Sequence, residues 1–242
     1  MRAFLLAICL LIIGVSYGQK SPAVHRQSPG LNGIGAFKIN VTTTADIELL
    51  ASKTGQPVMR TQSLQRLNYA ADSAIVLEVL PNKDILDASD QAIACPGYRV
   101  LFLPTYKVAG FTLRQVYLRF YAGRLIDIVP EWNEDLNEAL ALKHGKPYAR
   151  AKVAAVGCVF VNNGNRITHK AIEATEEWFN GSIRAVSYSS RRYDGQCREI
   201  LSKSFHIGND AKLKALNGCE AKQEQADRLR SIKEKKQRMS EI

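Results

Sequence analysis

Residues 111–147 read FTLRQVYLRFYAGRLIDIVPEWNEDLNEALALKHGKP, and they carry the clearest packing signal in the chain. An alternating segment leads to a two-residue turn at Ala122-Gly123, and a second segment returns towards Pro130. Two strand-like segments separated by a short glycine-containing turn are typical of an antiparallel hairpin. We therefore expect a β-hairpin here, followed by an amphipathic helix.

The first strand of this hairpin has two unlike faces. Successive side chains of a strand point to opposite sides, so Val116, Leu118 and Phe120 share one face. These apolar residues are expected in the core. The second face is only partly polar, and we expect it either to pack beneath a helix or to form a partner surface. It consists of Tyr117, Arg119 and Tyr121.

The end of the stretch has the pattern of a capped helix. Asn133 can accept a hydrogen bond from the first turn, Gly145 suits the C-terminal cap, and Pro147 blocks continuation. His144 lies on the apolar side of this helix and thus has a structural explanation, so we do not expect it to be catalytic. The predicted apolar stripe contains Leu136, Ala139, Leu140, Leu142 and His144.

Further elements follow from the same alternation, caps and turns. We expect residues 105–110 to form a turn, residues 153–161 to form a buried strand, and residues 168–178 to form a helix or helical turn. Residues 191–195 are expected to be a tight, basic, exposed connection, and its Arg191, Arg192 and Tyr193 are a second candidate partner surface. The other predicted strands are residues 34–41, 73–80, 98–103, 124–129, 182–190 and 196–207. A further short helix is expected after the N-cap hydroxyls of residues 42–44, and Lys53 and Gly55 are expected to end it.

These elements predict the α+β class, with antiparallel sheets packed against short helices. The order strand, helix, hairpin occurs in residues 31–150 and again in residues 151–210, so two similar subdomains within one fold are one interpretation. Residues 211–242 are highly charged, with oppositely charged side chains four apart, and they predict a C-terminal helix. That helix is interpreted either as an exposed tail or as a partner-docking element.

The first 18 residues have the features of a secretory signal. Arg2 precedes an apolar run over residues 3–15, and small residues at positions 16 and 18 predict cleavage after Gly18. Because the run is short for a membrane span, we expect a secreted or periplasmic protein with no transmembrane span after cleavage. Residues 19–30 are expected to be a flexible linker. Asn40 and Asn180 lie in glycosylation sequons, whose use depends on the export pathway.

Four cysteines remain after the predicted cleavage. An even number in an oxidising compartment favours two disulfide bonds. Three pairings are open, and we favour Cys158 with Cys197 because both lie in strand-like stretches. A structural metal site would need close cysteine pairs of the C-x-x-C kind, which the chain lacks. The disulfide candidates are Cys95, Cys158, Cys197 and Cys219.

The charge of the chain indicates what kind of partner it could meet. Lys and Arg outnumber Asp and Glu by 33 to 23, which gives a net charge of +10. Outside the cytoplasm, such a balance suits an acidic protein partner or an anionic envelope surface. Nucleic acid is not an expected partner, because export removes the chain from its usual target.

Signatures of catalysis and cofactor binding are missing from the sequence. It contains no G-x-S-x-G, Walker, H-E-x-x-H or dinucleotide motif, and its four histidines share no ligand spacing. Asp84, Asp87 and Asp90 recur every third residue, but a calcium loop alternates its oxygens around a glycine, and none lies between them. We therefore expect no enzyme activity, no cofactor and no metal.

Part of the chain resembles a known class of exported proteins. Residues 35–40 with 42–47, then 118–128 and 136–147, resemble the small α+β modules typified by the β-lactamase inhibitor protein and the small lipoprotein of the outer-membrane barrel-assembly machinery. The patterns FY-x-G-x-L and L-x-x-AL-x-x-K-x-G-x-P are also similar to those of other exported bacterial proteins. The resemblance implies the fold and no functional residues, and the lipidated N-terminal cysteine of the barrel-assembly lipoprotein has no counterpart here.

Three functions are therefore open. A non-enzymatic exported module for protein binding or envelope assembly agrees best with the missing motifs and with the resemblance. An inhibitor of an exported hydrolase is the second, by analogy with the β-lactamase inhibitor protein. The third is a hydrolase whose site assembles only in three dimensions and cannot be found from sequence.

Overall fold

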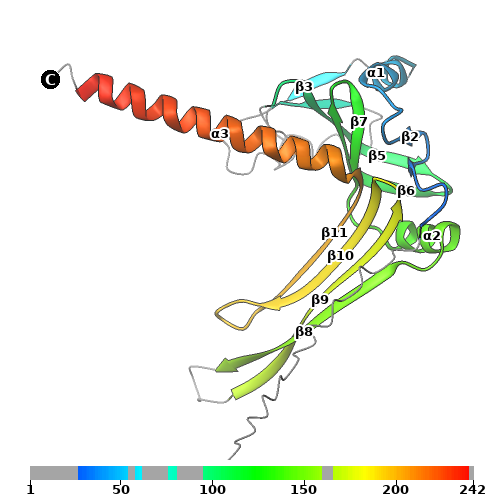
Figure 1. The fold of residues 1–242 in the computed structure, drawn as a ribbon. Helices are drawn as coiled ribbons and strands as arrows, with labels where there is room; N and C mark the ends of the chain where they lie inside the picture. The colour runs from blue at the N-terminus through cyan, green and yellow to red at the C-terminus, as the bar shows by residue number, and fades with distance from the viewer. Residues whose placement is uncertain (1–26, 54–57, 62–75, 81–94, 160–165, 240–242) are drawn as a thin grey trace, which may run out of the picture.

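The computed structural model describes residues 27–53, 58–61, 76–80, 95–159 and 166–239. Nine strands form one sheet in the order β3-β4-β5-β6-β7-β11-β10-β9-β8, antiparallel throughout except for β3 with β4 (Figure 1). With its helices and a small second sheet, the chain has the predicted α+β fold. The elements are β1 Gly33–Ile34, β2 Phe37–Lys38, α1 Thr44–Lys53, β3 Met59–Thr61, β4 Leu77–Val79, β5 Tyr98–Val108, β6 Phe111–Tyr121, β7 Arg124–Val129, α2 Glu134–His144, β8 Tyr148–Val159, β9 Arg166–Asn180, β10 Ile183–Tyr193, β11 Glu199–Asn209 and α3 Asp210–Met239.

The sheet is covered on both sides near its middle and left open at one end. On one side, α1, α2 and the β1–β2 segment enclose a core that includes Phe37, Ile47, Leu136 and Trp178. On the other side, the first turns of α3 cover a second core around Ile126. Figure 1 shows β8 to β11 extending away from these layers as a curved arm, and α3 projecting in a different direction.

The hairpin predicted from residues 111–147 is confirmed. Tyr121 pairs with Arg124, and Ala122 and Gly123 both have positive φ, 49° and 74°, as a type I′ turn requires. The expected core face is buried, since Val116, Leu118 and Phe120 are 0% exposed. Alternation along the strand therefore placed its inner face correctly.

The predicted caps of α2 are also confirmed. Asn133 accepts a hydrogen bond from the Leu136 N–H through its side-chain oxygen, and the Gly145 N–H donates to the Ala141 carbonyl. Leu136 and Leu140 are buried, as expected. Leu142, however, was wrongly placed in the apolar stripe. It follows Leu140 by two residues, about 200° around the helix, and is 88% exposed.

The helix predicted over residues 168–178 is wrong. These residues lie in β9, which pairs with β8 along one side and with β10 along the other. Asn180 pairs with Ile183 across the two-residue turn Gly181-Ser182, and so tight a turn needs extended chain on both sides. The apolar spacing that resembled a helix was overridden by strand pairing on both edges.

Three strand boundaries also differ from the expectations. Residues 105–108 continue β5, and the turn is Ala109-Gly110. Pro104 does not end the strand, because the β5–β6 pairing skips Pro104 and Gln115 and so does not need the N–H that proline lacks. Arg191, Arg192 and Tyr193 belong to β10 rather than to an exposed connection. Instead of one strand over residues 34–41, residues 33–38 form the short β1–β2 hairpin and residues 39–41 form a turn.

The strand predicted over residues 153–161 exists as β8, but it is not buried. β8 is the last strand of the sheet, and most of its side chains are exposed, with Val153 at 64%. The apolar run that suggested a core strand therefore lies at a free edge. Residues 160 and 161 fall outside the described part of the chain.

Several expectations concern residues outside the described part of the chain. The predicted signal, residues 19–26 and the three aspartates Asp84, Asp87 and Asp90 lie outside the described residues. Residues 27–30 of the predicted linker are held in place, since Gln27 bridges to Phe179 of β9 and Ser28 is buried. The boundary predicted after residue 150 falls within β8, while the division into two subdomains stays a prediction.

Two disulfide bonds are formed. Cys158 joins Cys197, the favoured pair, with Cα atoms 5.7 Å apart, and Cys95 joins Cys219 of α3, with Cα atoms 6.2 Å apart. This chemistry agrees with an oxidising compartment. Leu216 of α3 is fully buried and Leu213 packs beside it. Beyond Cys219 the helix continues for 20 residues, about 30 Å, and residues 228–239 at its end are all exposed.

The two halves of the sheet meet where β7 pairs with β11. Asp127 lies opposite Gly208, and Ile128 lies opposite Ile207. A Cβ atom on residue 208 would stand 2.5 Å from the Asp127 carboxylate and 2.8 Å from the Leu213 side chain. Only glycine fits this position without displacing a neighbour, so the residue type at 208 decides how closely β7, β11 and α3 approach.

Gly208→Ala is therefore expected to lower the free energy of unfolding by about 1–3 kcal/mol, the usual cost of overpacking a filled site. Gly157→Ala is the matched control, because a Cβ at residue 157 meets no atom within 4 Å. Urea unfolding of both variants measures the difference. Equal stability of the two variants would contradict a tight junction at Gly208.

Loss of the Cys95–Cys219 bond is expected to release α3 from the sheet. Changing both cysteines to serine should lower the unfolding free energy by about 2–5 kcal/mol and should speed tryptic cleavage after Lys212 and Lys214. Mass spectrometry of timed digests gives the cleavage rates. The Cys158→Ser, Cys197→Ser double variant serves as the control and should leave those two sites protected. Unchanged protection in the first variant would show that apolar packing alone holds α3.

Candidate binding surface

An open groove of about 700 Å³ lies on the outer part of β8, β9 and β10. Its floor is made of small apolar side chains, and its borders carry charged and aromatic groups. We call it the distal groove. It is lined by Lys152, Val153, Ala154, Val156, Ala171, Glu173, Arg192 and Tyr193.

Strand register explains why these side chains meet. Directly opposed residues of an antiparallel pair point to the same face. Ala154 lies opposite Ala171, and Lys152 lies opposite Glu173, so an apolar pair and a charged pair follow one another on one face. The small alanine side chains leave the space that larger residues would fill.

The polar groups at the border are linked to one another. The Arg192 guanidinium lies 3.5 Å from the Glu173 carboxylate and donates a hydrogen bond of 2.9 Å to the Tyr188 hydroxyl. These two partners, Tyr188 first, raise the pKa of Arg192, so the side chain stays charged. Tyr193 stacks on the His169 ring, with ring centroids 4.4 Å apart. The border is thus positioned before any ligand arrives.

The Cys158–Cys197 bond holds the outer end of the arm together. Cys158 lies on β8, whereas Cys197 follows β10, and β9 runs between these strands. Strands that are two apart in a flat sheet are separated by about 9.6 Å, which exceeds the reach of a disulfide. The turn after β10 must therefore lean across the end of β9. This covalent constraint gives the outer arm a fixed curvature beside the groove.

The turn that carries Cys197 is organised by one carboxylate. Asp194 accepts hydrogen bonds of 2.9 Å from the Gln196 and Arg198 N–H groups, and one of 2.7 Å from the Arg198 guanidinium. These bonds, with the Arg198 N–H first, hold the pKa of Asp194 below its ordinary value. Cys197 adopts a positive φ of 61° within this network. A rigid turn thus supports the disulfide.

The outer edge of β8 is open in the part of the chain that the structure describes, since no strand there pairs with it. β8 has 12 residues, and the sequence Val153–Val159 within it contains no charged side chain. Arg150 and Lys152 precede this run, and β8 has no acidic residue. An edge of this length exposes backbone N–H and C=O groups that can pair with another chain.

The predicted partner residues fall into two separate places. Arg192 and Tyr193 line the distal groove, whereas Arg191 points to the opposite face and lies 3.1 Å from Glu199. Tyr117 and Tyr121 lie far from the groove, against the second core under α3. Burial raises the pKa of the Tyr117 phenol, in keeping with a covered side chain.

Arg119, between these tyrosines, belongs to a buried polar cluster. Its guanidinium donates to the Asp127 carboxylate at 3.0 Å and to the Tyr98 hydroxyl at 2.8 Å. The His206 Nδ1 atom lies 3.3 Å from the other oxygen of Asp127, which is 1% exposed. The cluster holds β5, β6, β7 and β11 together at the sheet junction.

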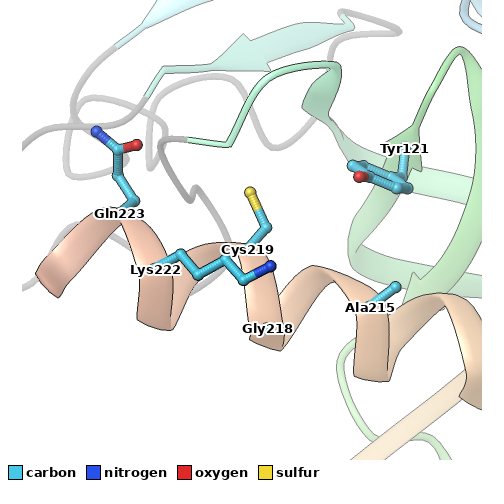
Figure 2. Close-up of a pocket in the computed structure, with 6 residues that line it drawn as sticks. All are labelled: Tyr121, Ala215, Gly218, Cys219, Lys222 and Gln223. Atoms are coloured by element: carbon cyan, nitrogen blue, oxygen red, sulfur yellow. The ribbon is translucent and has the colours of Figure 1, made fainter. Parts of the chain in front are cut away.

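A second cavity, of about 600 Å³, lies between Tyr121 and α3 (Figure 2). Gly218 and Cys219 form part of its helical side, and Lys222 and Gln223 extend it along α3. Figure 2 shows the Tyr121 ring facing this side of the helix. The cavity lies beside the Cys95–Cys219 bond. Among the described residues that line it, Lys222 is the one charged side chain.

Sequence reasoning found Arg192 and Tyr193 but missed the rest of the groove. Ala171 and Glu173 were overlooked because their segment was interpreted as a helix, and Ala154 because its strand was expected to be buried. The tight turn before Ile183 was the signal that could have identified β9 as a strand. The small side chains of β8, which are mainly alanine and valine, were the signal that this strand does not fill a core.

Comparison with known proteins gives no match to this chain among family models, curated proteins or solved structures. The resemblance to small exported α+β modules stays a prediction. Among the described residues, no helix is long and apolar enough to span a membrane, and no three His, Cys, Asp or Glu side chains gather closely enough to hold a metal ion.

The Asp194 turn is expected to be sensitive to acid. Because the pKa of Asp194 is lowered below 3.8 in the folded chain, its hydrogen bonds are present above that pH and are lost as the pH falls through the lowered pKa. NMR signals of the Gln196 and Arg198 amides should therefore titrate with a midpoint below 3.8. In Asp194→Ala the same amides should show no such titration and should exchange faster. A midpoint at or above the ordinary value would contradict the network.

Proposed function

We propose that this chain is a non-enzymatic exported protein-binding module, which holds an extended segment of a partner protein along β8 and in the distal groove. The observation that carries this proposal is the exposed edge of β8 beside an apolar groove. Twelve residues of extended chain measure about 40 Å. A surface of that length suits a peptide strand better than a compact small molecule.

Strand addition would use both the backbone and the side chains of this surface. An incoming strand gains hydrogen bonds from the open edge, while its alternate side chains enter a neighbouring groove. Val153 and Val156 lie at the point where the edge and the groove meet, and Val153 is 64% exposed. Covering these side chains would remove apolar surface from water, which favours binding.

The charges of the surface indicate the composition of the segment. Arg150 and Lys152 lie on β8, and Arg192 lies at the groove border, whereas Glu173 is the acidic residue that lines the groove. The balance is positive, so an apolar segment with Asp or Glu residues is the complementary ligand. Arg150 is paired with Glu177 of β9 at 2.6 Å and Arg192 with Glu173 at 3.5 Å. With Lys152, the lining of the groove therefore has one positive charge more than it has negative ones.

Rigidity of the arm supports binding over catalysis. The disulfide, the Asp194 turn and the contacts of Arg192 fix the groove before a ligand arrives, and a preformed surface loses little conformational entropy on binding. The ionisable groups of the groove are joined to one another, as Arg192 is to Glu173. Such an arrangement presents a shaped surface and no activated nucleophile.

Selection from a phage-displayed library of random peptides tests the proposal. Selected peptides are expected to alternate apolar residues and to contain Asp or Glu. Val153→Asp should weaken their binding by about tenfold or more, because it removes an apolar contact and adds a repelling charge. Calorimetry with a selected peptide measures the change.

Leu142→Asp is the matched control, because Leu142 is 88% exposed on α2 and the substitution changes charge and size in the same way. It should leave peptide affinity unchanged. Thermal unfolding of both variants confirms that the fold is intact. Peptides that bind equally well to the Val153→Asp variant, or that are enriched in Lys and Arg, would overturn the proposal.

A further inference from the structure

The projecting end of α3 is basic and has one apolar side. Residues 228–239 contain six Lys and Arg and a single acidic residue, Glu234. All twelve are exposed, and among them Leu229, Ile232 and Met239 are 61%, 46% and 76% exposed. Their exposure is unusual for large apolar side chains that lie on one helix.

Helical geometry places the apolar and the charged residues in a definite order. At about 100° per residue, Leu229, Ile232 and Met239 fall within an arc of roughly 80°. Basic residues border this arc on both sides and also lie within it. These near-side cations are Arg228, Lys233, Lys235 and Lys236.

The acidic residues are on the opposite side of the helix. Asp227 and Glu234 both point away from the apolar arc, together with Arg230 and Arg238. Arg230 lies 4.0 Å from Asp227, so part of the far-side charge is already compensated. The helix therefore has an apolar and cationic near side and a mixed far side.

We propose that residues 228–239 of α3 lie flat on an anionic lipid surface, with Leu229, Ile232 and Met239 entering the interface. An apolar arc bordered by Lys and Arg is the pattern of helices that lie in the plane of a membrane. An acidic protein partner would not require apolar side chains to be enclosed by cations in this way. The projection of α3 away from the sheet, seen in Figure 1, leaves this segment accessible on all sides.

The inference is independent of the distal groove. α3 and the β8 edge extend in different directions from the sheet junction (Figure 1). Binding of α3 to lipid would hold the chain at a surface while the arm stays exposed. Failure of either proposal would leave the other standing.

Vesicle sedimentation tests the proposal with the chain that begins at Gln19, because the apolar run before it would itself bind lipid. The chain should sediment with vesicles of phosphatidylcholine and phosphatidylglycerol in equal parts, and should remain in solution with phosphatidylcholine alone. Raising the salt concentration should weaken binding, because it screens the charges.

Two double variants that remove the same charge separate a lipid surface from a general attraction to anions. Lys233→Gln with Lys236→Gln changes the near side, and should weaken binding about 25-fold, since each cation near a membrane contributes about 1 kcal/mol. Arg230→Gln with Arg238→Gln changes the far side, and should weaken binding less than about threefold. Ile232→Ser should weaken binding without any change of charge.

Circular dichroism confirms that each variant keeps its helix. Equal losses in the two double variants would overturn the proposal and favour an acidic protein or another soluble polyanion, which attracts cations on every side. Sedimentation with neither vesicle, or equally with both, would also overturn it.

Discussion

The close contact of β7 with β11 is the constraint on which the rest of the structure depends. Two strands from opposite halves of the chain pair over Asp127, Ile128, Ile207 and Gly208, and the missing side chain at residue 208 makes room for the Asp127 carboxylate. The Arg119 guanidinium pairs with that carboxylate and the His206 ring lies beside it, so side chains from both halves of the sheet surround a buried acidic residue. This pairing joins the two halves of the sheet, so the nine strands form one unit through a short and closely packed junction.

The two extensions of the molecule take their direction from the same junction. β11 ends at Asn209, whose side-chain oxygen accepts a hydrogen bond from the Lys212 N–H and so caps α3. The helix therefore begins at Asp210, two residues after Gly208. On the other side, β10, β9 and β8 follow β11 outwards. Asn137 of α2 contacts Glu176 of β9 and Ser187 of β10, and the outer ends of these strands extend beyond α2 (Figure 1). Each extension is then fastened by one disulfide, Cys95–Cys219 at the helix and Cys158–Cys197 at the arm.

This arrangement explains why the two proposed binding surfaces lie at the periphery of the molecule. The middle of the sheet is covered on both faces and serves stability, while the arm and the projecting helix expose apolar side chains that a folded monomer would normally enclose. Both exposed surfaces carry basic residues, in line with the net charge of +10. The partners that we propose for them differ in kind, because the arm exposes strand backbone and the helix exposes only side chains.

Local sequence patterns alone determined several secondary-structure elements of this protein. The hairpin with Ala122-Gly123, the caps of α2 at Asn133 and Gly145, the inner face of β6 and the C-terminal helix were all predictable, because each depends on residues within one or two turns of chain. The pairing of Cys158 with Cys197 was a preference that the structure confirmed, although spacing alone left three pairings open.

Tertiary structure decided the features on which the proposed function depends. Residues 168–178 have helical spacing, but pairing with β8 and β10 satisfies their backbone along both edges and makes them a strand. The apolar run in β8 is that of a core strand, and its place at the end of the sheet leaves it exposed. Tyr117 and Tyr121 are residue types that are common in partner surfaces, yet both are half-buried against the second core beneath α3. In each case the deciding contact comes from residues far away in the chain. Neither the periodicity nor the composition of a segment shows which distant element will pack against it.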